Sequence, residues 1–406
     1  MTQPKSVLIV SVDFLPQIGG VSLMSHYLAN GFTEIDSHVR VLAPAGARVL
    51  EELTADYELI VDEASNPNCR EGNNYIHETE RIIAVLETAH RQRPIDQLLL
   101  LHPFYYGYPA LQFAQHHSIA IGCYFHGFEL RSQMIKQPTL AERSKQRSKA
   151  YVDLRYNTLT LVRECSKIFV NSSVTGELVY DCGRTDYVIT GCGLATQTVS
   201  EHLVEFDQRD TSTAREALGL PSTNDLTQDV HLLGFLGRFV SSKNVAFLIR
   251  LLAENPNLHL ALAGVGDHEK LVELATELEL NSRVHFVGEL SEEQKWRFLS
   301  ALDLFCLPSI MLPDGRMEGF GIVLLEATLV GTPVAVSTQG GMSDFVLTKN
   351  GMYFDVDSVT RSEQAVSNLL ENEPRQKSMV TSAQNLLLER LLYPQIAGRI
   401  SAALDS

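Results

Sequence analysis

The sequence predicts an α/β protein of two tandem units, each with a parallel sheet covered by helices. Short apolar runs alternate with longer runs of helical period along the whole chain, which is the pattern of successive βα units. A polar stretch from Gly191 to Asp229 interrupts this alternation, and a fresh apolar run begins at His231. The 406 residues also give room for two or three domains of about 150 residues each. We therefore place one domain over 1–195 and a second over 196–391.

The strands are predicted from the apolar runs themselves. In the first series they are Ser6–Val12, His38–Leu42, Glu58–Val61, Gln97–Leu101, Ile119–Phe125, Lys167–Asn171 and Asp186–Thr190. In the second series they are His231–Leu236, Leu258–Ala263, Arg283–Val287, Leu304–Leu307, Pro333–Val336 and Gly351–Phe354. Helical periodicity predicts helices between them, among them Val21–Asn30, Thr79–Gln92 and Ala141–Glu164. Because ligands bind at the carboxyl ends of parallel strands, polar motifs at those ends are the site candidates.

Composition argues against several functions. Lys and Arg number 33 against 49 Asp and Glu, and a net charge of −16 argues against a nucleic-acid binder. We find no apolar run of the roughly 18 residues that cross a bilayer and no secretory signal, so we expect a cytoplasmic protein. Residues 131–167 hold nine basic and three acidic side chains, which indicates a solvated helix face or, alternatively, contact with a membrane or partner. The six scattered cysteines form no C-x-x-C pair and fit reduced core positions.

The most informative motif is Glu318-Gly-Phe-Gly, which runs through Ile322 to Glu326. Its two glycines permit a sharp backbone turn, and a helix starting near Ile322 would direct free N–H groups at a ligand. Glu326 would lie about one turn inside this helix, so the two carboxylates can address different parts of one extended ligand. Each suits vicinal hydroxyls, because a carboxylate accepts hydrogen bonds from adjacent O–H donors. For either glutamate alone, a helix cap or a surface position is the ordinary alternative.

A second motif, Gly237-Arg238 with Lys243, follows the strand 231–236. An arginine fork and a lysine point charge together neutralise a diphosphate well, and Ser241 or Ser242 can cap the helix that follows. A solvated pair of surface cations is the commoner alternative. The position of the Arg238–Lys243 motif at a strand end favours the role in ligand binding.

Weaker candidates follow other strands. Gly19-Gly20 opens a helix, as glycines do in phosphate-binding loops. His126 and Gly264 follow directly after predicted strands. Each of these candidates has an ordinary alternative, as a turn residue or as a core residue. Asp355-Val-Asp357 has the D-x-D spacing that binds metal in some sugar transferases. Because it lies between a strand and a helix, we interpret it as turn and N-cap chemistry.

Together, Gly19-Gly20, His126-Gly127-x-Glu129, Gly237-Arg238-x4-Lys243 and Glu318-Gly-Phe-Gly-x4-Glu326 resemble the retaining family 4 glycosyltransferases. The resemblance is closest in the second half, which also has Gly331-Thr-Pro-Val334 and Gly340-Gly341. It implies the GT-B fold, in which two Rossmann-like domains face each other across a cleft. It also implies that a C-terminal helix, over 392–406, returns to the first domain. The chain departs from the family's pattern at Gly191–Ala195 and at Asp344.

The resemblance assigns roles to individual residues. Arg238 and Lys243 would hold the donor diphosphate and stabilise the leaving group, Glu318 the donor sugar, and Glu326 the ribose hydroxyls. His126 would approach the transferred sugar. The remaining donor-binding positions are Gly19, Gly20, Gly237, Gly264, Gly319, Phe320, Gly321 and Ile322.

These roles describe a hexosyltransferase that moves a sugar from a nucleotide-diphosphate donor to a hydroxyl acceptor with retention. The acceptor would be a glycan, a lipid-linked sugar or a small molecule. No metal or other cofactor is expected, because the two cations do the electrostatic work that a metal does elsewhere. Two alternatives remain at this point: a nucleotide-sugar epimerase and a catalytically silent nucleotide-sugar-binding subunit.

Overall fold

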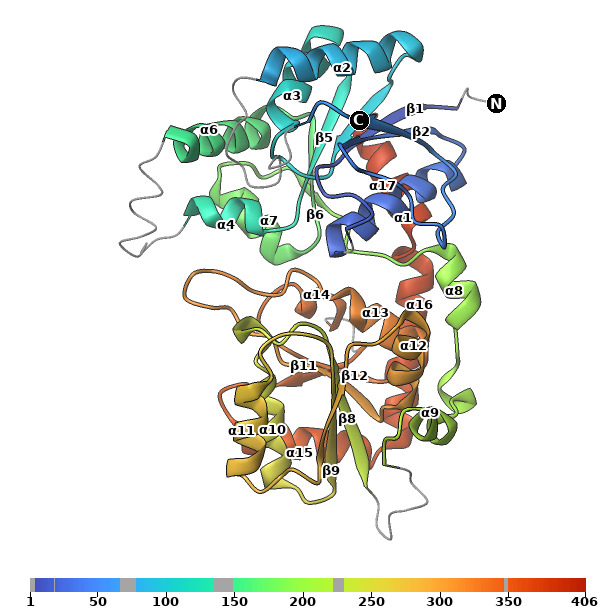
Figure 1. Ribbon diagram of the computed structural model, residues 1–406, viewed down its shortest axis with the longest axis vertical. Helices are drawn as coiled ribbons and strands as arrows, with labels where there is room; N and C mark the ends of the chain where they lie inside the picture. The colour runs from blue at the N-terminus through green and yellow to red at the C-terminus, as the bar shows by residue number, and fades with distance from the viewer. Residues whose placement is uncertain (1–3, 18, 66–77, 135–148, 222–229, 347–349) are drawn as a thin grey trace. The chain divides into compact units, whose positions relative to one another are not determined.

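The chain forms two compact units in a computed structural model (Figure 1). Unit 1 comprises Met1–Thr196 with Arg390–Ser406, and unit 2 comprises Gln197–Glu389. The structure describes residues 4–17, 19–65, 78–134, 149–221, 230–346 and 350–406.

Unit 1 is built on a seven-stranded parallel sheet in the order β3-β2-β1-β4-β5-β6-β7. Each strand lies within a residue or two of a predicted apolar run. The strands are β1 (Ser6–Val10), β2 (His38–Pro44), β3 (Glu58–Asp62), β4 (Gln97–Leu100), β5 (Ala120–Phe125), β6 (Lys167–Val170) and β7 (Tyr187–Ile189).

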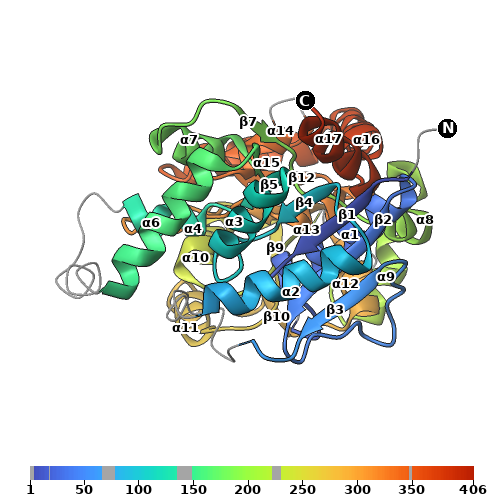
Figure 2. The ribbon, with the colours of Figure 1, turned by 90° about the horizontal axis from the view of Figure 1, so that it is seen from above.

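Both faces of this sheet are buried because successive side chains of each strand alternate between two cores. On β1, Val7 and Ile9 enter one core while Leu8 and Val10 enter the other. The first core packs against α1 and α17, and the second against α2, α3 and α6 (Figure 2). The helix bounds are α1 (Gly20–Glu34), α2 (Thr79–Gln92), α3 (Gly107–His117), α4 (Phe128–Met134), α6 (Lys149–Glu164), α7 (Ser173–Asp181) and α17 (Tyr393–Leu404).

Helix α17 comes from the far end of the chain but belongs to unit 1. Its buried side chains include Tyr393, Ile396 and Ile400, which join the core shared with α1. A Cβ on Gly31 of α1 would lie 2.6 Å from the Tyr393 backbone, so the absent side chain lets the two helices touch. The sheet of unit 1 is therefore covered on one face by a helix that follows unit 2 in the sequence.

Unit 2 has a six-stranded parallel sheet in the order β10-β9-β8-β11-β12-β13. Its strands are β8 (His231–Leu236), β9 (Leu258–Ala263), β10 (Val284–Gly288), β11 (Leu304–Leu307), β12 (Val334–Ser337) and β13 (Met352–Phe354). Its α-helices are α8 (Thr196–His202), which starts one residue before the unit, α9 (Thr211–Ala217), α10 (Val245–Glu254), α11 (Glu269–Glu277), α12 (Glu292–Ala301), α13 (Ile322–Leu329), α14 (Met342–Val346), α15 (Val359–Leu370) and α16 (Glu373–Arg390). In Figure 1, α10, α11 and α15 lie on one side of this sheet and α12 and α13 on the other.

Each sheet reverses its strand order once. In unit 1 the reversal lies between β1 and β4, and in unit 2 between β8 and β11. Such reversals open a crevice at the carboxyl ends of the strands, where open α/β sheets bind ligands. The predicted α/β class with parallel sheets in two Rossmann-like units is confirmed.

Two further expectations came from the sequence, one about membrane-spanning segments and one about the cysteines. None of the helices in the described segments has the length and apolarity needed to span a bilayer. Cys123, Cys165, Cys192 and Cys306 are free and buried and Cys182 is free and half-buried, while Cys69 lies outside the described residues.

Candidate functional site

Lys243 and Glu318 form an ion pair at the point where the strand order of unit 2 reverses. Lys243 follows β8, Glu318 follows β11, and both side chains are largely shielded from solvent, at 18% and 17% exposed. Burial alone would raise the pKa of Glu318, but Lys243 and the backbone N–H groups of Phe320 and Gly319 hold it below its ordinary value. The carboxylate is therefore ionised and fixed in direction.

The loop that carries Lys243 does not cap its helix as predicted. Ser241–Lys243 form a short 3-10 turn, and α10 starts after Asn244, which has a left-handed φ of 52° and makes no side-chain cap bond. The expectation that Ser241 or Ser242 caps this helix is wrong, because the extra turn places both serines before the cap position. The carbonyl of Ser242 instead accepts a hydrogen bond from the Ile310 N–H at 2.8 Å, which ties this loop to the chain leading to Glu318.

The start of α13 has the form that the glycines of the motif predict. Gly321 occupies the N-cap with a φ of 86°, a conformation that costs a side-chain-bearing residue energy, and Ile322 begins the helix. Gly319 donates its N–H to Glu318 Oε1 at 3.1 Å, and Phe320 is buried. The carbonyl of Glu318 accepts from the Gly341 N–H at 3.1 Å. The unpaired N–H groups of a helix start thus lie directly beside the Lys243–Glu318 pair.

Gly237 and Gly264 bring the ends of β8 and β9 into direct backbone contact. Gly264 has a φ of 129°, and a Cβ there would lie 2.0 Å from the Gly237 carbonyl oxygen. The two strand ends are joined by the Gly237 N–H bond to the Ala263 carbonyl at 3.0 Å. No side chain larger than hydrogen fits at Gly264, so this glycine shapes the floor of the site.

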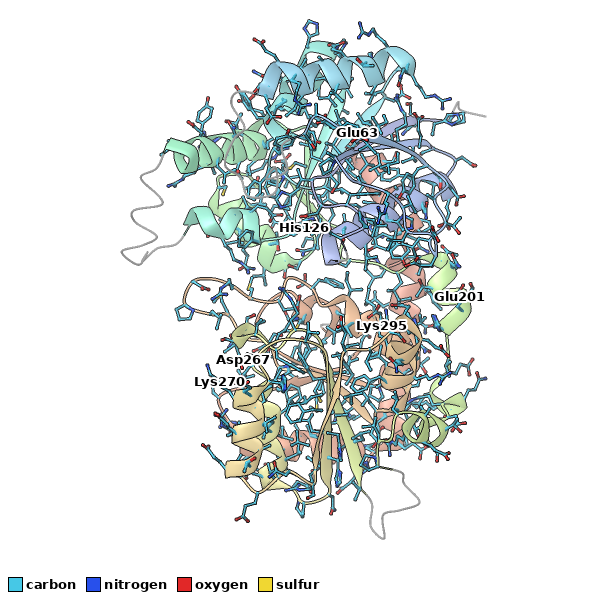
Figure 3. All side chains as sticks on the ribbon, in the orientation of Figure 1. Glu63, His126, Glu201, Asp267, Lys270 and Lys295 are labelled. Carbon is cyan, nitrogen blue, oxygen red and sulfur yellow. The ribbon has the colours of Figure 1, made fainter. Side chains whose placement is uncertain are left out.

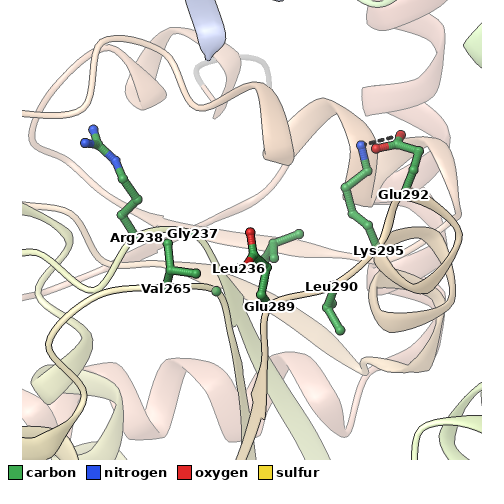
Figure 4. Close-up of a pocket in the computed structure, with 9 residues that line it drawn as sticks. Leu236, Gly237, Arg238, Val265, Glu289, Leu290, Glu292 and Lys295 are labelled. Atoms are coloured by element: carbon green, nitrogen blue, oxygen red, sulfur yellow. Dashed lines mark ion pairs between the residues drawn. The ribbon is translucent and has the colours of Figure 1, made fainter. Parts of the chain in front are cut away.

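A pocket of about 230 Å³ opens above these strand ends, in unit 2 alone. Figure 4 shows Arg238 on one side of it and Lys295 with Glu292 on the other. Arg238 is exposed, and its guanidinium makes no ion pair or hydrogen bond with any other part of the chain that the structure describes. Lys243 does not line this pocket. The full lining is Leu236, Gly237, Arg238, Gly264, Val265, Glu289, Leu290, Glu292 and Lys295.

Glu326 lies one turn further along α13 and is held by Lys295. The Lys295 Nζ is 2.7 Å from Glu326 Oε1 and 2.7 Å from Glu292 Oε1. Glu326 is 15% exposed, so its carboxylate is reachable from only a narrow direction. The pair places a second carboxylate on the helix that begins beside Glu318, as the motif predicts.

In unit 1, Gly19 and Gly20 begin α1 directly after the β1 loop. Gly19 is the N-cap residue and Gly20 the first residue of the helix, and both are exposed. A Cβ built on Gly20 meets no atom within 4 Å. The fold itself does not require a glycine at this position, whereas a ligand approaching the helix start would.

His126 follows β5 and is fixed by three contacts. Its Nε2 donates to the Leu101 carbonyl at 2.9 Å, its ring stacks on Tyr124, and its backbone N–H donates to Glu129 Oε2 at 3.1 Å. Because a carbonyl only accepts, Nε2 carries the proton and Nδ1 is left as an acceptor. Figure 3 shows His126 where the strands of unit 1 end.

Glu129 is buried in this cluster, and its Oε1 also lies 3.5 Å from His102 Nε2. Burial lowers the pKa of His102, against the opposing charges of Glu129 and Asp13. His102 was missed by the sequence analysis, although the signal was present: it directly follows the predicted strand 97–101. The site residues predicted in unit 1 thus lie at the ends of β1 and β5, and His102 lies at the end of β4.

The D-x-D pair has the predicted turn chemistry. Asp357 donates its N–H to Asp355 Oδ1 at 3.1 Å, and Arg361 pairs with Asp355. The N-cap of α15 is Ser358 rather than either aspartate. Across the described ranges, no three His, Cys, Asp or Glu side chains are grouped to hold a metal ion.

The basic segment 131–167 is described only in part. Residues 135–148, with Lys136, Arg143, Lys145 and Arg147, lie outside the described residues. Large apolar side chains are exposed in the described part of the segment and just before it: Phe128 is 62% exposed, Val152 53% and Tyr156 64%. Contact of this segment with a membrane or a partner stays a prediction.

Sequence comparison connects unit 2 to known proteins. Residues 222–386 match the family model described as glycosyl transferases group 1. A D-inositol 3-phosphate glycosyltransferase of Mycolicibacterium gilvum is 31% identical over 193 residues, which cover 45% of this chain and 39% of that protein. A GDP-mannose-dependent monoacylated alpha-(1-6)-phosphatidylinositol monomannoside mannosyltransferase of Corynebacterium glutamicum is 30% identical over 176 residues, covering 42% and 44%. The chain thus matches about two fifths of the length of these relatives.

Structure comparison extends the similarity to the whole fold. Sucrose-phosphate synthase from Thermosynechococcus elongatus aligns with a TM-score of 0.72 at 17% identity over 98% of both chains. Anabaena HepE in complex with UDP aligns with a TM-score of 0.71 at 18% identity, over 98% of this chain and 99% of that one. Residues 222–386 therefore match the glycosyl transferases group 1, and the two parallel-sheet units of the chain have the GT-B fold.

Proposed function

We propose that this protein is a retaining glycosyltransferase that moves a sugar from a nucleotide-diphosphate donor to a hydroxyl group of an acceptor. The observation that carries the proposal is the Lys243–Glu318 pair at the start of α13, at the strand-order reversal of a group 1 domain. A cation, an ionised carboxylate and free helix N–H groups then meet where a charged leaving group and a hydroxyl-rich sugar would both be bound.

The diphosphate is assigned to Arg238, Lys243 and the helix start. A nucleoside diphosphate carries about two charges that must be neutralised when it leaves the sugar. Lys243 already donates to Glu318, but an ammonium has three donors and keeps two for phosphate oxygens. The Arg238 guanidinium has no partner among the described residues and can turn its fork to the same group.

The chemical step follows from this placement. The bond between the anomeric carbon and the β-phosphate oxygen breaks, and its electron pair stays on the phosphate held by the two cations. The acceptor oxygen bonds to the anomeric carbon from the same face, and its proton passes to the departing phosphate. The configuration at the anomeric carbon is thereby retained.

Carboxylates and an imidazole then hold the hydroxyl groups. Glu318 accepts from hydroxyls of the transferred sugar, and Glu326 accepts from those of the ribose. His126 offers Nδ1 to the sugar from unit 1, and Gly19 and Gly20 leave space for phosphate at the start of α1. These roles agree with those that the motifs imply.

The class of donor is supported by the names of related proteins. One relative is GDP-mannose-dependent, and Anabaena HepE was crystallised with UDP and with UDP-glucose. Both donors are nucleotide-diphosphate sugars, the class that an Arg–Lys pair and a ribose-binding carboxylate suit. We further propose that no metal is needed, since Arg238 and Lys243 supply the positive charge. Turnover that persists in EDTA tests this, and dependence on added Mg²⁺ or Mn²⁺ would overturn it.

The test begins with a thermal-shift screen of UDP-, GDP- and ADP-sugars, because a ligand that prefers the native state raises the melting temperature. The stabilising donor is then incubated with hydroxyl acceptors, and products are resolved by mass spectrometry and NMR. We expect donor consumption only with an acceptor and a product of unchanged anomeric configuration. An altered sugar formed without acceptor would indicate an epimerase, and binding without consumption a silent subunit; either result would overturn the proposal.

A further inference from the structure

Lys295 is a shielded cation that the proposed chemistry does not use. Its Nζ lies 2.7 Å from an oxygen of Glu326 and 2.7 Å from an oxygen of Glu292, and its side chain is 19% exposed. The ammonium also lies 4.5 Å from the centroid of the Trp296 ring, which is itself stacked on His202. Glu326, Glu292 and Trp296 thus hold the direction of one lysine at the edge of the pocket, where Figure 4 shows Lys295 beside Glu292.

This lysine remains charged despite its surroundings. Burial alone would lower the pKa of Lys295, but Glu326 and Glu292 together raise it above its ordinary value. A charged lysine at this place balances a pocket edge that is otherwise acidic, with Glu289 and Glu292 in the lining and Glu326 in contact with the lysine. An approaching diphosphate would meet repulsion from these carboxylates if the lysine were absent.

The contact also determines which part of Glu326 remains available. Lys295 takes one lone pair of Oε1, and Oε2 accepts no hydrogen bond from any described residue. A carboxylate has about four acceptor positions, so about three of those on Glu326 are left for a ligand. Two vicinal hydroxyls can be accepted by a carboxylate fixed in this way without further reorganisation.

We propose that Lys295 is a positioning residue that fixes Glu326 to accept the 2′ and 3′ hydroxyls of the donor nucleotide's ribose. The role rests on the proposed function, because it requires a nucleotide donor in this pocket. It goes beyond that function by naming a residue that acts on the ribose through Glu326. Its contribution should therefore depend on whether the ligand has ribose hydroxyls.

The experiment pairs a protein change with a ligand change. Affinities for UDP and GDP, and for their 2′,3′-dideoxy counterparts, are measured by calorimetry on the wild type, Lys295→Met and Lys295→Arg. We expect Lys295→Met to weaken the better-binding ribonucleotide about tenfold to hundredfold and its dideoxy form by less than about threefold, because the hydroxyl contact is lost. Lys295→Arg should retain most of the preference for ribose, and in turnover Lys295→Met should raise KM for the donor more than it lowers kcat.

Two controls separate positioning from a general structural effect. Lys270 is 83% exposed on α11, does not line the pocket and lies apart from Lys295 in Figure 3, so Lys270→Met should change no affinity. Glu326→Gln should remove the same ribose preference, and the Lys295→Met/Glu326→Gln double variant should lose no more than the larger single loss. If Lys295→Met does not fold, the other two variants still test the role of Lys295. Lys295→Arg must keep the preference for ribonucleotides over dideoxynucleotides, and Glu326→Gln must lose it.

The outcomes distinguish this role from the proposed function. A wild type that prefers ribonucleotides while Lys295→Met keeps that preference overturns the role of Lys295 alone. Equal losses for ribonucleotide and dideoxynucleotide also overturn it, since the lysine would then act through charge and not through Glu326. A wild type that binds no nucleoside diphosphate overturns both the donor assignment and the role built on it.

Discussion

The candidate sites of the two units use different chemistry at equivalent places in their sheets. At the strand-order reversal of unit 2, opposite charges meet in the Lys243–Glu318 pair. The corresponding edge of unit 1 presents imidazoles, with His102 and His126 held by the buried carboxylate of Glu129. Under the proposed function, this difference would give the units separate roles, with unit 2 stabilising charge and unit 1 orienting hydroxyl groups.

Removing the cation of unit 2 should have the largest effect. We expect Lys243→Met to lower turnover by about 10²–10³-fold, because a positioned donor to the developing phosphate charge is lost. It should also lower stability, since Glu318 remains shielded without its counter-ion. Steady-state kinetics and urea unfolding measure the two effects.

A second change separates these two losses. Adding Glu318→Gln to Lys243→Met should recover stability without recovering turnover, and Lys270→Met serves as the exposed-lysine control. Full activity in Lys243→Met would contradict the division between the units.

The next largest effect is expected at Gly264. Alanine there would place a Cβ 2.0 Å from the Gly237 carbonyl oxygen, so we expect a loss of about 3 kcal/mol in the free energy of unfolding. Thermal and urea denaturation check this value. Gly20→Ala is the matched control, because its Cβ meets no atom within 4 Å and stability should stay within about 0.5 kcal/mol. Unchanged stability in Gly264→Ala would mean that the two strand ends can separate.

The imidazole of unit 1 should matter less than the cation of unit 2. We expect His126→Ala to lower kcat/KM about tenfold to hundredfold, through loss of one hydrogen bond to the sugar. The exposed His116 on α3 gives the control substitution His116→Ala, which should leave kcat/KM unchanged. A loss as large as that of Lys243→Met would show that unit 1 takes part in charge stabilisation.

Gly20→Ala tests whether the helix start of unit 1 approaches a ligand. The variant should keep its fold, and we expect its affinity for the donor to fall about fivefold. Such a fall would report steric contact between the added methyl group and phosphate alone. Calorimetric titration of the donor nucleotide measures it. Wild-type affinity in this variant would remove Gly20 from the donor site.

The smallest expected effect is a pH dependence of stability. Burial lowers the pKa of His26 in unit 1 and His259 in unit 2 to about 4, while unfolded imidazoles titrate near 6.5. Between these values the unfolded chain binds more protons, so stability should fall as pH decreases from 6.5 toward 4. His26→Asn and His259→Asn should each flatten this decrease in urea titrations at several pH values. An unchanged slope in both would show that other groups dominate.

The sequence was most informative where a local pattern decides the structure. Apolar runs predicted strands such as β1 and β8 because parallel strands are buried on both faces. The Gly319–Gly321 spacing predicted the start of α13 because the glycine conformation at Gly321 is itself local. Strands and helix starts of this kind can be predicted from neighbouring residues alone.

Features that depend on contacts between separate elements could not be predicted in this way. Lys295 is on α12 and Glu326 is on α13, and no pattern in the sequence of either helix predicts the 2.7 Å contact between them. The start of α10 also departed from expectation, because the left-handed Asn244 displaced the cap beyond both serines. His102 could have been found, since it follows an apolar run as His126 does, but its partner Glu129 lies on another element.

The position of α17 has a consequence for the order of events during translation. The apolar face of unit 1 that receives Ile396 and Ile400 is synthesised first, yet its cover leaves the ribosome only after the whole of unit 2. Residues 197–389 can therefore complete their core earlier than the segment that precedes them, reversing the usual N-terminal-first sequence of folding. A nascent chain halted before residue 390 would carry a finished unit 2 together with a unit 1 that still exposes hydrophobic surface to chaperones.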